Sequence, residues 1–234
     1  MRGVFVTGTD TGVGKSVVAA AICAALTARG ERVAAFKPVV TGLDEEPEPS
    51  PLGDRWPPDH ELLAGAASAG QSPEDVAPHR FGPPVSPHYA AELAGMRLEP
   101  ADLADAARSA GEGSDALVCE GIGGLLVPFT TGYLVRDLAI DLGLPAVVVA
   151  RPGVGTINHT LLALESAATG GMRVAGVVMT PWPEDPSGIE ESNRETIERL
   201  GDVIVAALPA IAPSDLARAG QELPLELWLE GGGG

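Results

Sequence analysis

A glycine-rich stretch near the beginning of the chain constrains the fold more than any other part of the sequence. Residues 8–16 read GTDTGVGKS and lie between an apolar run at residues 3–7 and an alanine-rich run that extends to residue 29. A buried strand, a glycine-rich turn and a helix in this order are the setting of a phosphate-binding loop, or P-loop. The usual pattern GxxxxGK[ST] is displaced by one residue, because its first glycine falls on Thr9 and Gly8 stands beside it.

The residues of this stretch suit a nucleoside triphosphate. Its glycines allow backbone N–H groups to turn inward around phosphate oxygens, and the start of the following helix adds positive partial charge. Lys15 is placed to reach the β- and γ-phosphates, and the hydroxyl of Ser16 is placed to bind Mg²⁺. We therefore expect a P-loop protein that spends its nucleotide on chemistry.

Apolar runs and helical segments alternate along the rest of the chain. We expect strands at residues 3–7, 32–40, 116–119, 146–150, 174–179 and 203–206, and helices at residues 15–29, 59–69, 100–110, 133–142, 156–169 and 188–200. This alternation predicts an α/β fold with a mostly parallel central sheet flanked by helices on both faces. A single P-loop NTPase-type domain over residues 1–230 is expected, followed by a flexible glycine tail at residues 231–234.

Composition argues against several classes of function. The formal net charge of −17 makes a nucleic-acid-binding surface unexpected. Neither a signal-peptide pattern nor an apolar run of about 18 residues is present, so we expect a cytoplasmic protein without membrane partners. The cysteines Cys23 and Cys119 form no CxxC pair, so the sequence predicts no zinc site or redox motif.

Two charged residues follow predicted strands at the edge where a parallel sheet binds its ligands. That edge collects the carboxyl ends of the strands, so the loops after the expected strands should share one face. Glu120 ends one strand and is a candidate metal ligand, and the glycine-rich residues 121–124 are expected to form a tight loop. Lys37 ends another strand and is a candidate second cation for an anionic ligand.

Further candidate ligand residues lie at a helix start, close after Lys37 and in a glycine-rich turn. Asp59 begins a predicted helix, where it would bind metal or cap the helix, and Asp54 is a competing carboxylate. Thr41 follows Lys37 closely and adds a hydroxyl donor. The glycine-rich turn at residues 153–155 leads into a helix whose N-terminus would suit a carboxylate.

Together these motifs resemble the dethiobiotin synthetase family of biotin synthesis. The resemblance rests on the runs VTGTDTGVGKS at residues 6–16, KPV at 37–39, TG at 41–42, SPH at 86–88, EGIGGLLVP at 120–128 and GTINHT at 155–160. It extends through nearly the whole chain. The Lys-Pro pair and the EGxGG run are more diagnostic of the family than the P-loop alone.

The resemblance implies an ATP-dependent cyclo-ligase and a set of roles for residues of this chain. Its co-substrates are ATP with Mg²⁺, CO2 or bicarbonate, and 7,8-diaminononanoate, and the enzyme is expected to be a homodimer. Catalytic roles fall on Lys15 and Lys37, and metal ligation on Ser16, Asp59 and Glu120. Substrate contacts fall on Thr11, Lys37 and Thr41 near the carbamate, and on Gly155, Thr156, Ile157 and Asn158 for the distal carboxylate across the dimer interface. The implied nucleotide contacts are Gly12, Val13, Gly14, Lys15, Ser16, Val17, Asp59, Glu120, Gly121, Ile122, Gly123, Thr180, Pro181, Pro209, Ala210 and Ile211.

The chain departs from the family pattern at three positions. Gly12 stands where some members carry Glu, Ser16 replaces the more usual Thr, and Thr180-Pro181 stands where other members have Asn in the base-recognition turn. The position of Gly12 therefore supplies no carboxylate, and the nucleotide base preference stays open.

Rival functions lack motifs that they require. A regulatory ATPase of the partitioning type is the main alternative, but it places a signature lysine where Asp10 stands here. A cobyrinate amide synthase needs a glutaminase domain, and a GTPase switch needs an Asn-Lys-x-Asp motif that the sequence lacks. If the synthetase reading holds, Lys37→Ala is expected to cut turnover sharply while leaving the fold intact.

Overall fold

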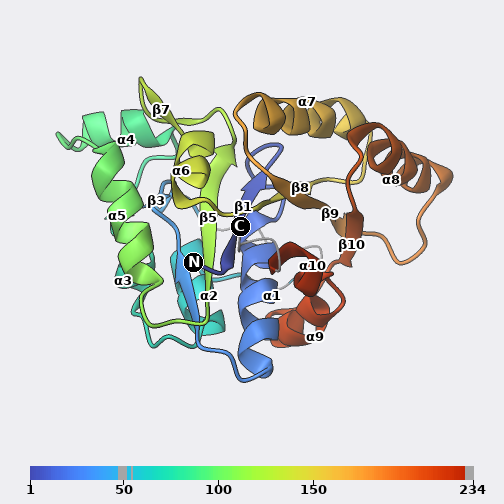
Figure 1. Cartoon of the computed structure of the whole chain (residues 1–234), viewed down its shortest axis with the longest axis horizontal. Coiled ribbons are helices and arrows are strands. Elements are labelled where there is room, and N and C mark those ends of the chain that lie inside the picture. Colours follow the sequence, from blue (N-terminus) through green and yellow to red (C-terminus); the bar gives the residue numbers. More distant parts are fainter. Residues whose placement is uncertain (47–51, 54, 230–234) are drawn as a thin grey trace.

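A computed structural model describes residues 1–46, 52–53 and 55–229 of the chain (Figure 1). The competing carboxylate Asp54 and the predicted glycine tail at residues 231–234 lie outside the described residues. None of the helices in the described part of the chain has the length and apolar character needed to cross a bilayer.

A parallel sheet forms the centre of the molecule. Its strand order is β10-β9-β8-β1-β5-β2, and every neighbouring pair runs parallel. The strands are β1 (Gly3–Gly8), β2 (Val33–Phe36), β5 (Ala116–Gly124), β8 (Ala146–Ala150), β9 (Val174–Trp182) and β10 (Val205–Pro209). The predicted α/β fold class is therefore confirmed.

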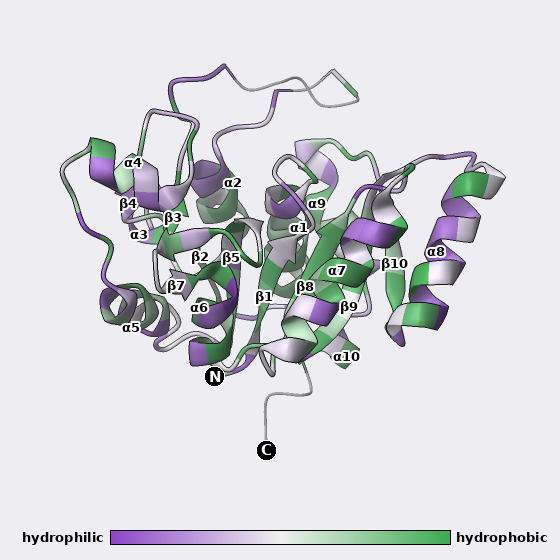
Figure 2. Cartoon of the chain, turned by 90° about the horizontal axis from the view of Figure 1, so that it is seen from above, coloured by the Kyte–Doolittle hydropathy of each residue, from purple (hydrophilic) through white to green (hydrophobic). Residues whose placement is uncertain are grey.

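Helices cover both faces of this sheet, because its strands alternate in the direction of their apolar side chains. In β1, Val4 and Val6 pack into one buried cluster, whereas Phe5 packs into another on the opposite face. Figure 2 shows α1, α2 and α9 on one side of the sheet, and α6 and α7 on the other. The first cluster includes side chains of α1 (Lys15–Ala28), α2 (Asp59–Ala66), α3 (Pro73–Val76), α9 (Leu216–Gln221) and α10 (Leu225–Leu229). The opposite face is covered by α4 (Pro87–Leu93), α5 (Pro100–Ala110), α6 (Val135–Leu142), α7 (Thr156–Thr169) and α8 (Gly188–Gly201).

Several elements differ from the sequence prediction. The strand expected at residues 32–40 divides, because Pro38 has no N–H to continue the ladder. Residues Val39–Val40 form β3, which pairs with β4 (His79–Arg80) in a separate small sheet. The tight loop expected at residues 121–124 is instead the end of β5, where Gly124 pairs with Gly8. The helix expected at residues 133–142 begins as the short strand β7 (Tyr133–Leu134), which pairs with β6 (Pro128–Thr130).

Asp59 does not cap its helix. It is the first residue of α2, and Pro58 occupies the N-cap position without a side-chain hydrogen bond. A carboxylate in the first turn still interacts favourably with the helix dipole. The side chain of Asp59 is consequently free of the capping role that the sequence left open for it.

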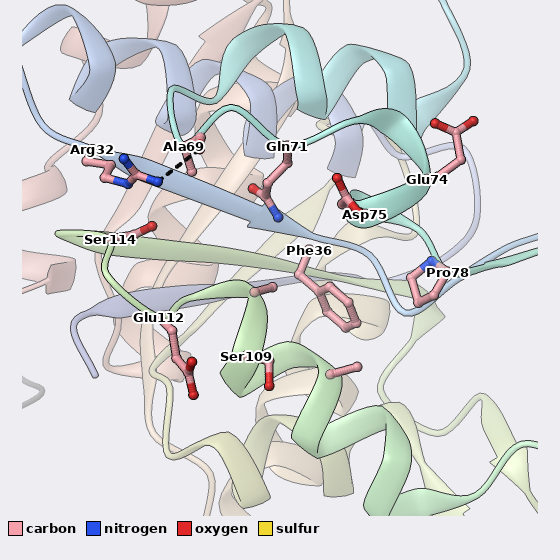
Figure 3. Close-up of a pocket in the computed structure, with 12 residues that line it drawn as sticks. Arg32, Phe36, Ala69, Gln71, Glu74, Asp75, Pro78, Ser109, Glu112 and Ser114 are labelled. Atoms are coloured by element: carbon pink, nitrogen blue, oxygen red, sulfur yellow. Dashed lines mark hydrogen bonds between the residues drawn. The ribbon is translucent and has the colours of Figure 1, made fainter.

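The open edge of β2 is paired by a side chain rather than by another strand. The amide of Gln71 accepts a hydrogen bond from the N–H of Ala35 and donates one to its carbonyl, at 2.8 and 3.0 Å. A hollow of about 500 Å³ lies beside this edge, and Figure 3 shows Phe36 among the residues that line it. The hollow is lined by no P-loop residue, so it is separate from the predicted nucleotide site.

Candidate functional site

The candidate ligand residues form a row along the carboxyl edge of the sheet. Because the strands are parallel, this row follows the strand order. Lys37 follows β2, Glu120 lies in β5, the P-loop follows β1, and Thr180 lies near the end of β9. The turn before α7 follows β8, between the P-loop and β9. Pro209 ends β10, and Ala210 and Ile211 follow it at the end of the row farthest from Lys37.

The P-loop takes a conformation that depends on its glycines. Gly12 and Gly14 have φ values of 70° and 95°, in the left-handed region that favours glycine. Gly14 is the N-cap of α1 and no side chain caps the helix there. The first N–H groups of α1, including those of Ser16 and Val17, therefore have no cap and are suited to bind an anion. The amine of Lys15 folds back over the loop and donates to the carbonyl of Asp10 at 2.8 Å.

A buried lysine joins the loop after β2 to two carboxylates. The Nζ atom of Lys37 lies 2.6 Å from Oδ2 of Asp59 and 2.5 Å from Oε1 of Glu120. The hydroxyl of Ser16 donates to the same Oε1 atom at 2.8 Å. Residues from the loop after β2 and from α1, α2 and β5 thus meet beside the P-loop. They include all three predicted metal ligands and one predicted catalytic lysine.

Burial and neighbouring charges shift the pKa values of these groups. Burial alone would lower the pKa of Lys37, but the two carboxylates outweigh it and raise that pKa above its usual range. Burial, together with the neighbouring charge of Lys37, lowers the pKa of Lys15 to about 8. The pKa of Glu120 is raised by its complete burial, which the charge of Lys37 only partly offsets. Although burial would raise the pKa of Asp59, Lys37 lowers it below its usual value.

One oxygen of Glu120 marks a position for a cation. Its Oε2 atom is buried and has no hydrogen-bond partner among the described residues. A buried carboxylate oxygen without a partner is costly unless a ligand or metal satisfies it. In the described part of the chain, no three His, Cys, Asp or Glu side chains gather to hold a metal by themselves. A cation here would therefore take further ligands from phosphate and water, as Mg²⁺ commonly does.

Other predicted residues border this cluster at their backbone. A Cβ atom at Gly14 would lie 2.8 Å from Cγ2 of Thr180, so Thr180 contacts the P-loop. The base-recognition turn expected at Thr180 and Pro181 is instead part of β9, which continues to Trp182. A Cβ atom at Gly123 would lie 3.6 Å from Oγ1 of Thr11. Gly123, at a φ of 60°, therefore lies beside Thr11 of the P-loop, whereas a Cβ atom at Gly121 would meet Val135 and Phe5 instead.

The remaining substrate candidates make no hydrogen bond to Lys37 among the described residues. Thr41 follows β3, and no hydrogen bond joins its side chain to Lys37 within the described residues. Gly155 is the N-cap of α7 with a φ of 92°, and Thr156, Ile157 and Asn158 form the first turn of that helix. The segment that leads into this turn is fixed by Asn193 of α8, which donates to the carbonyls of Pro152 and Gly153 at 2.9 and 3.2 Å.

Sequence reasoning missed one cation at this edge. The guanidinium of Arg151 donates to the carbonyl of Gly12 at 3.1 Å, so it contacts the P-loop from the end of β8. The rule that singled out Lys37, a cation directly after a predicted strand, applies equally to Arg151. Only the strand order, which places β8 beside β1, reveals that this cation meets the P-loop.

The fold and the site together define a class of protein. The features of a P-loop NTPase-type protein are all present: a parallel sheet, a glycine-rich loop that leads into a helix with Lys15 and Ser16, and a carboxylate on the neighbouring strand.

A family model described as an AAA domain matches residues 2–217. The ATP-dependent dethiobiotin synthetase of Anaeromyxobacter dehalogenans is 42% identical, over 95% of this chain and 96% of the relative. That of Bacillus subtilis is 35% identical, over 91% of this chain and 89% of the relative. The chain belongs to the ATP-dependent dethiobiotin synthetase family.

Solved structures share the fold at low identity. A ParA family ATPase from Chlorobium tepidum has a TM-score of 0.55 and 12% identity, over 94% of this chain and 90% of its own. The septum site-determining protein MinD of Pyrococcus horikoshii, complexed with Mg-ADP, has a TM-score of 0.54 and 17% identity, over 98% and 89% of the two chains. These likenesses extend to the fold alone, so they do not favour the partitioning-type alternative over the synthetase family.

Proposed function

We propose that this chain closes the ureido ring of dethiobiotin from 7,8-diaminononanoate, CO2 and ATP. The observation that carries the proposal is the meeting of Lys37, Glu120 and Ser16 beside the P-loop of a chain that belongs to this family. The reaction joins several anions, and a site of this kind offers fixed positive charge at the point where they meet.

The P-loop holds the triphosphate in this proposal. Backbone N–H groups from Gly12 to Val17 surround the phosphates, and Lys15 exchanges the Asp10 carbonyl for phosphate oxygens. The base lies toward β9 and β10. There the proposed contacts are Thr180, Pro181, Pro209, Ala210 and Ile211, while Asp59 and the Glu120–Gly123 segment border the nucleotide on the other side.

Ser16, Asp59 and Glu120 would hold Mg²⁺. The unpartnered Oε2 atom of Glu120 and the hydroxyl of Ser16 beside its other oxygen fit such an ion. When bound, Mg²⁺ would neutralise charge on the phosphates. Release of Lys37 from one of its two carboxylates would free its amine for the substrate.

Substrate binding in the proposal uses residues beside the P-loop and the start of helix α7. Lys37, Thr11 and Thr41 position the carbamate beside the γ-phosphate. The first turn of α7, from Gly155 to Asn158, binds the distal carboxylate through its free N–H groups. As the resemblance implies, this turn would come from the partner subunit of a cytoplasmic homodimer.

The chemistry then needs little more than positioning and charge. One amine adds to CO2 and loses a proton to give a carbamate. A carbamate oxygen attacks the γ-phosphorus as the bond to ADP breaks. The second amine then attacks the carbamate carbon and loses a proton as the bond from that carbon to the phosphate oxygen breaks, which closes the ring and releases phosphate. Lys15 and Lys37 stabilise the negative charge on the transferring group throughout.

A direct assay tests the proposal. The purified chain is incubated with 7,8-diaminononanoate, bicarbonate, Mg²⁺ and ATP, and the product is measured by mass spectrometry. Dethiobiotin formed in step with ADP is the expected result. ATP hydrolysis that is independent of the diamine, without dethiobiotin, would overturn the proposal and favour the regulatory ATPase.

A further inference from the structure

Arg151 is a cation at the ligand edge to which the mechanism above gives no role. It follows directly after β8, the strand that pairs with β1 on the side opposite to β5. Lys37 and Arg151 therefore lie on opposite sides of the P-loop. Arg151 is exposed, and among the described residues it pairs with no carboxylate, although the chain carries a formal net charge of −17.

The position of Arg151 relative to the P-loop is fixed by several hydrogen bonds. The N–H of Thr9 donates to the carbonyl of Val149 at 2.9 Å, which ties the loop to the end of β8. Asn193 holds the carbonyls of Pro152 and Gly153 on the other side of Arg151. The side chain itself donates to the carbonyl of Gly12 at 3.1 Å. The contact thus joins two segments whose backbones are already held in place.

Gly12 leaves the space in which this guanidinium lies. A Cβ atom at Gly12 would lie 3.2 Å from Nη2 of Arg151, and apart from Gly12 and its two chain neighbours no other heavy atom of the described residues is within 4 Å of that point. The absence of a side chain at this loop position therefore opens it to Arg151. A side chain at position 12 would crowd the guanidinium of Arg151, a cation that directly follows the neighbouring strand β8.

The guanidinium of Arg151 has hydrogen-bond donors that remain available to a ligand. It carries five N–H donors in a planar fork, and the bond to Gly12 is the only side-chain hydrogen bond of Arg151 among the described residues. An oxyanion is a stronger acceptor than a peptide carbonyl, and a planar fork suits two oxygens at once. Arg151 is thus able to keep Gly12 and still present donors to a ligand above the loop.

From this geometry we infer that Arg151 binds an oxyanion of the reactants across the P-loop from Lys37. The inference rests on the proposed function for the identity of those reactants. Two oxyanions come together beside the loop, the γ-phosphate of ATP and the carbamate of the substrate. Both have the chemistry that a guanidinium fork recognises, and experiment separates them.

Arg151→Ala and Arg151→Lys test the inference, with Arg32→Ala as the matched control. Arg32 is also exposed and donates to a backbone carbonyl, that of Ala69 at 3.2 Å, but it lies beside the open edge of β2 (Figure 3). The measurements are kcat and KM for dethiobiotin formation, the Kd of MgATP without diamine by calorimetry, and the Tm of each variant.

Arg151→Ala is expected to reduce turnover or MgATP affinity by about 10- to 100-fold, the range of a lost hydrogen bond to a charged group. A weaker Kd for MgATP identifies the triphosphate as the partner. An unchanged Kd with a lower kcat identifies the carbamate. Arg151→Lys keeps the charge without the fork and is expected to recover part of the loss, whereas Arg32→Ala is expected to match the unaltered chain.

Two results would overturn the inference. One is an Arg151→Ala variant that stays within about twofold of Arg32→Ala in kcat, KM and Kd. The other is a loss of activity that accompanies a lower Tm and that lysine does not recover, because a packing role then explains it. If the unaltered chain forms no dethiobiotin, the proposed function fails separately, and the Kd of MgATP still decides whether Arg151 binds the triphosphate.

Discussion

The amine of Lys37 lies 2.5 Å from the carboxylate of Glu120, and solvent reaches neither charge: the side chains are 4% and 0% exposed. The pair joins two strands of the sheet at the edge where nucleotide is proposed to bind. Removing the charge of Lys37 would leave the fully buried carboxylate of Glu120 without its lysine partner, whereas Lys37 also has Asp59 as a partner. The pair therefore links the proposed catalysis to the stability of the fold.

Lys37→Ala is accordingly expected to lose activity and stability together. We expect dethiobiotin formation to fall at least about 100-fold and the free energy of unfolding to fall by about 3–5 kcal/mol. This extends the prediction from sequence alone, which assumed an intact fold. The double variant Lys37→Met, Glu120→Gln removes both charges and is expected to regain stability but not activity. Urea denaturation and the mass assay measure both effects, and full activity in Lys37→Ala would rule out its catalytic role.

Glu120→Gln is expected to separate metal binding from nucleotide binding. Glutamine keeps the size of the side chain and an oxygen for Ser16, but it removes the negative charge beside the unpartnered oxygen. The ratio of the Kd of ATP without Mg²⁺ to the Kd with Mg²⁺ is expected to be about 10- to 100-fold smaller in this variant than in the unaltered chain. Calorimetric titrations of ATP with Mg²⁺ and with EDTA measure this difference. An equal effect of Mg²⁺ in both proteins would exclude Glu120 as a ligand.

The lowered pKa of Lys15 predicts proton uptake on nucleotide binding. In the ligand-free protein its amine loses its proton as pH rises through about 8, instead of the ordinary 10.5. A bound triphosphate favours the charged amine, so ATP affinity should fall as pH rises above about 8. At about pH 9, binding is expected to take up nearly one proton.

Calorimetry in two buffers of different ionisation enthalpy measures this proton uptake. Lys15→Met serves as the control, because it has no amine to protonate and should show no uptake from this site. Proton release, or uptake that persists in Lys15→Met, would contradict the assignment.

Gly220→Ala is expected to destabilise the fold away from the site. A Cβ atom at Gly220 in α9 would lie 2.0 Å from the carbonyl oxygen of Ala21 in α1, so the two helices would have to separate. The expected loss is about 1–3 kcal/mol in the free energy of unfolding. Gly65→Ala in α2 is the matched control, because its Cβ atom meets nothing within 4 Å. That variant should gain about 1 kcal/mol from helix propensity, and urea denaturation of both gives the comparison.

Elements with a strong local signal could be predicted from the sequence. Strand β8 at Ala146–Ala150 and helix α7 at Thr156–Thr169 have the bounds that the sequence predicted. Each is a continuous apolar or helical run that ends at glycine, proline or polar residues. The short helix α10 was not predicted, because tertiary packing holds it in place. A Cβ atom at Gly176 of β9 would lie 2.5 Å from the indole of Trp228, which fills that space.

The sequence could predict those site residues that lie at the ends of strands. Lys37 and Glu120 were singled out because each comes at the end of an apolar run, and the structure brings them into contact. The contact between Arg151 and Gly12 depends on which strands are neighbours in space. Strand order is set by the packing of the whole chain, so the local pattern around Arg151 could not indicate its partner.

The position of β1 in the sheet has a consequence for how the protein is made. Its two neighbours, β5 and β8, begin at Ala116 and Ala146, more than 100 residues further along the chain. Helix α1, which follows the P-loop, also packs on α9, which begins at Leu216. A ribosome that has just released the P-loop segment therefore exposes a strand without partners. We expect the P-loop to reach its final shape only after these partners have been made, so that ATP would stabilise the finished chain rather than the nascent one.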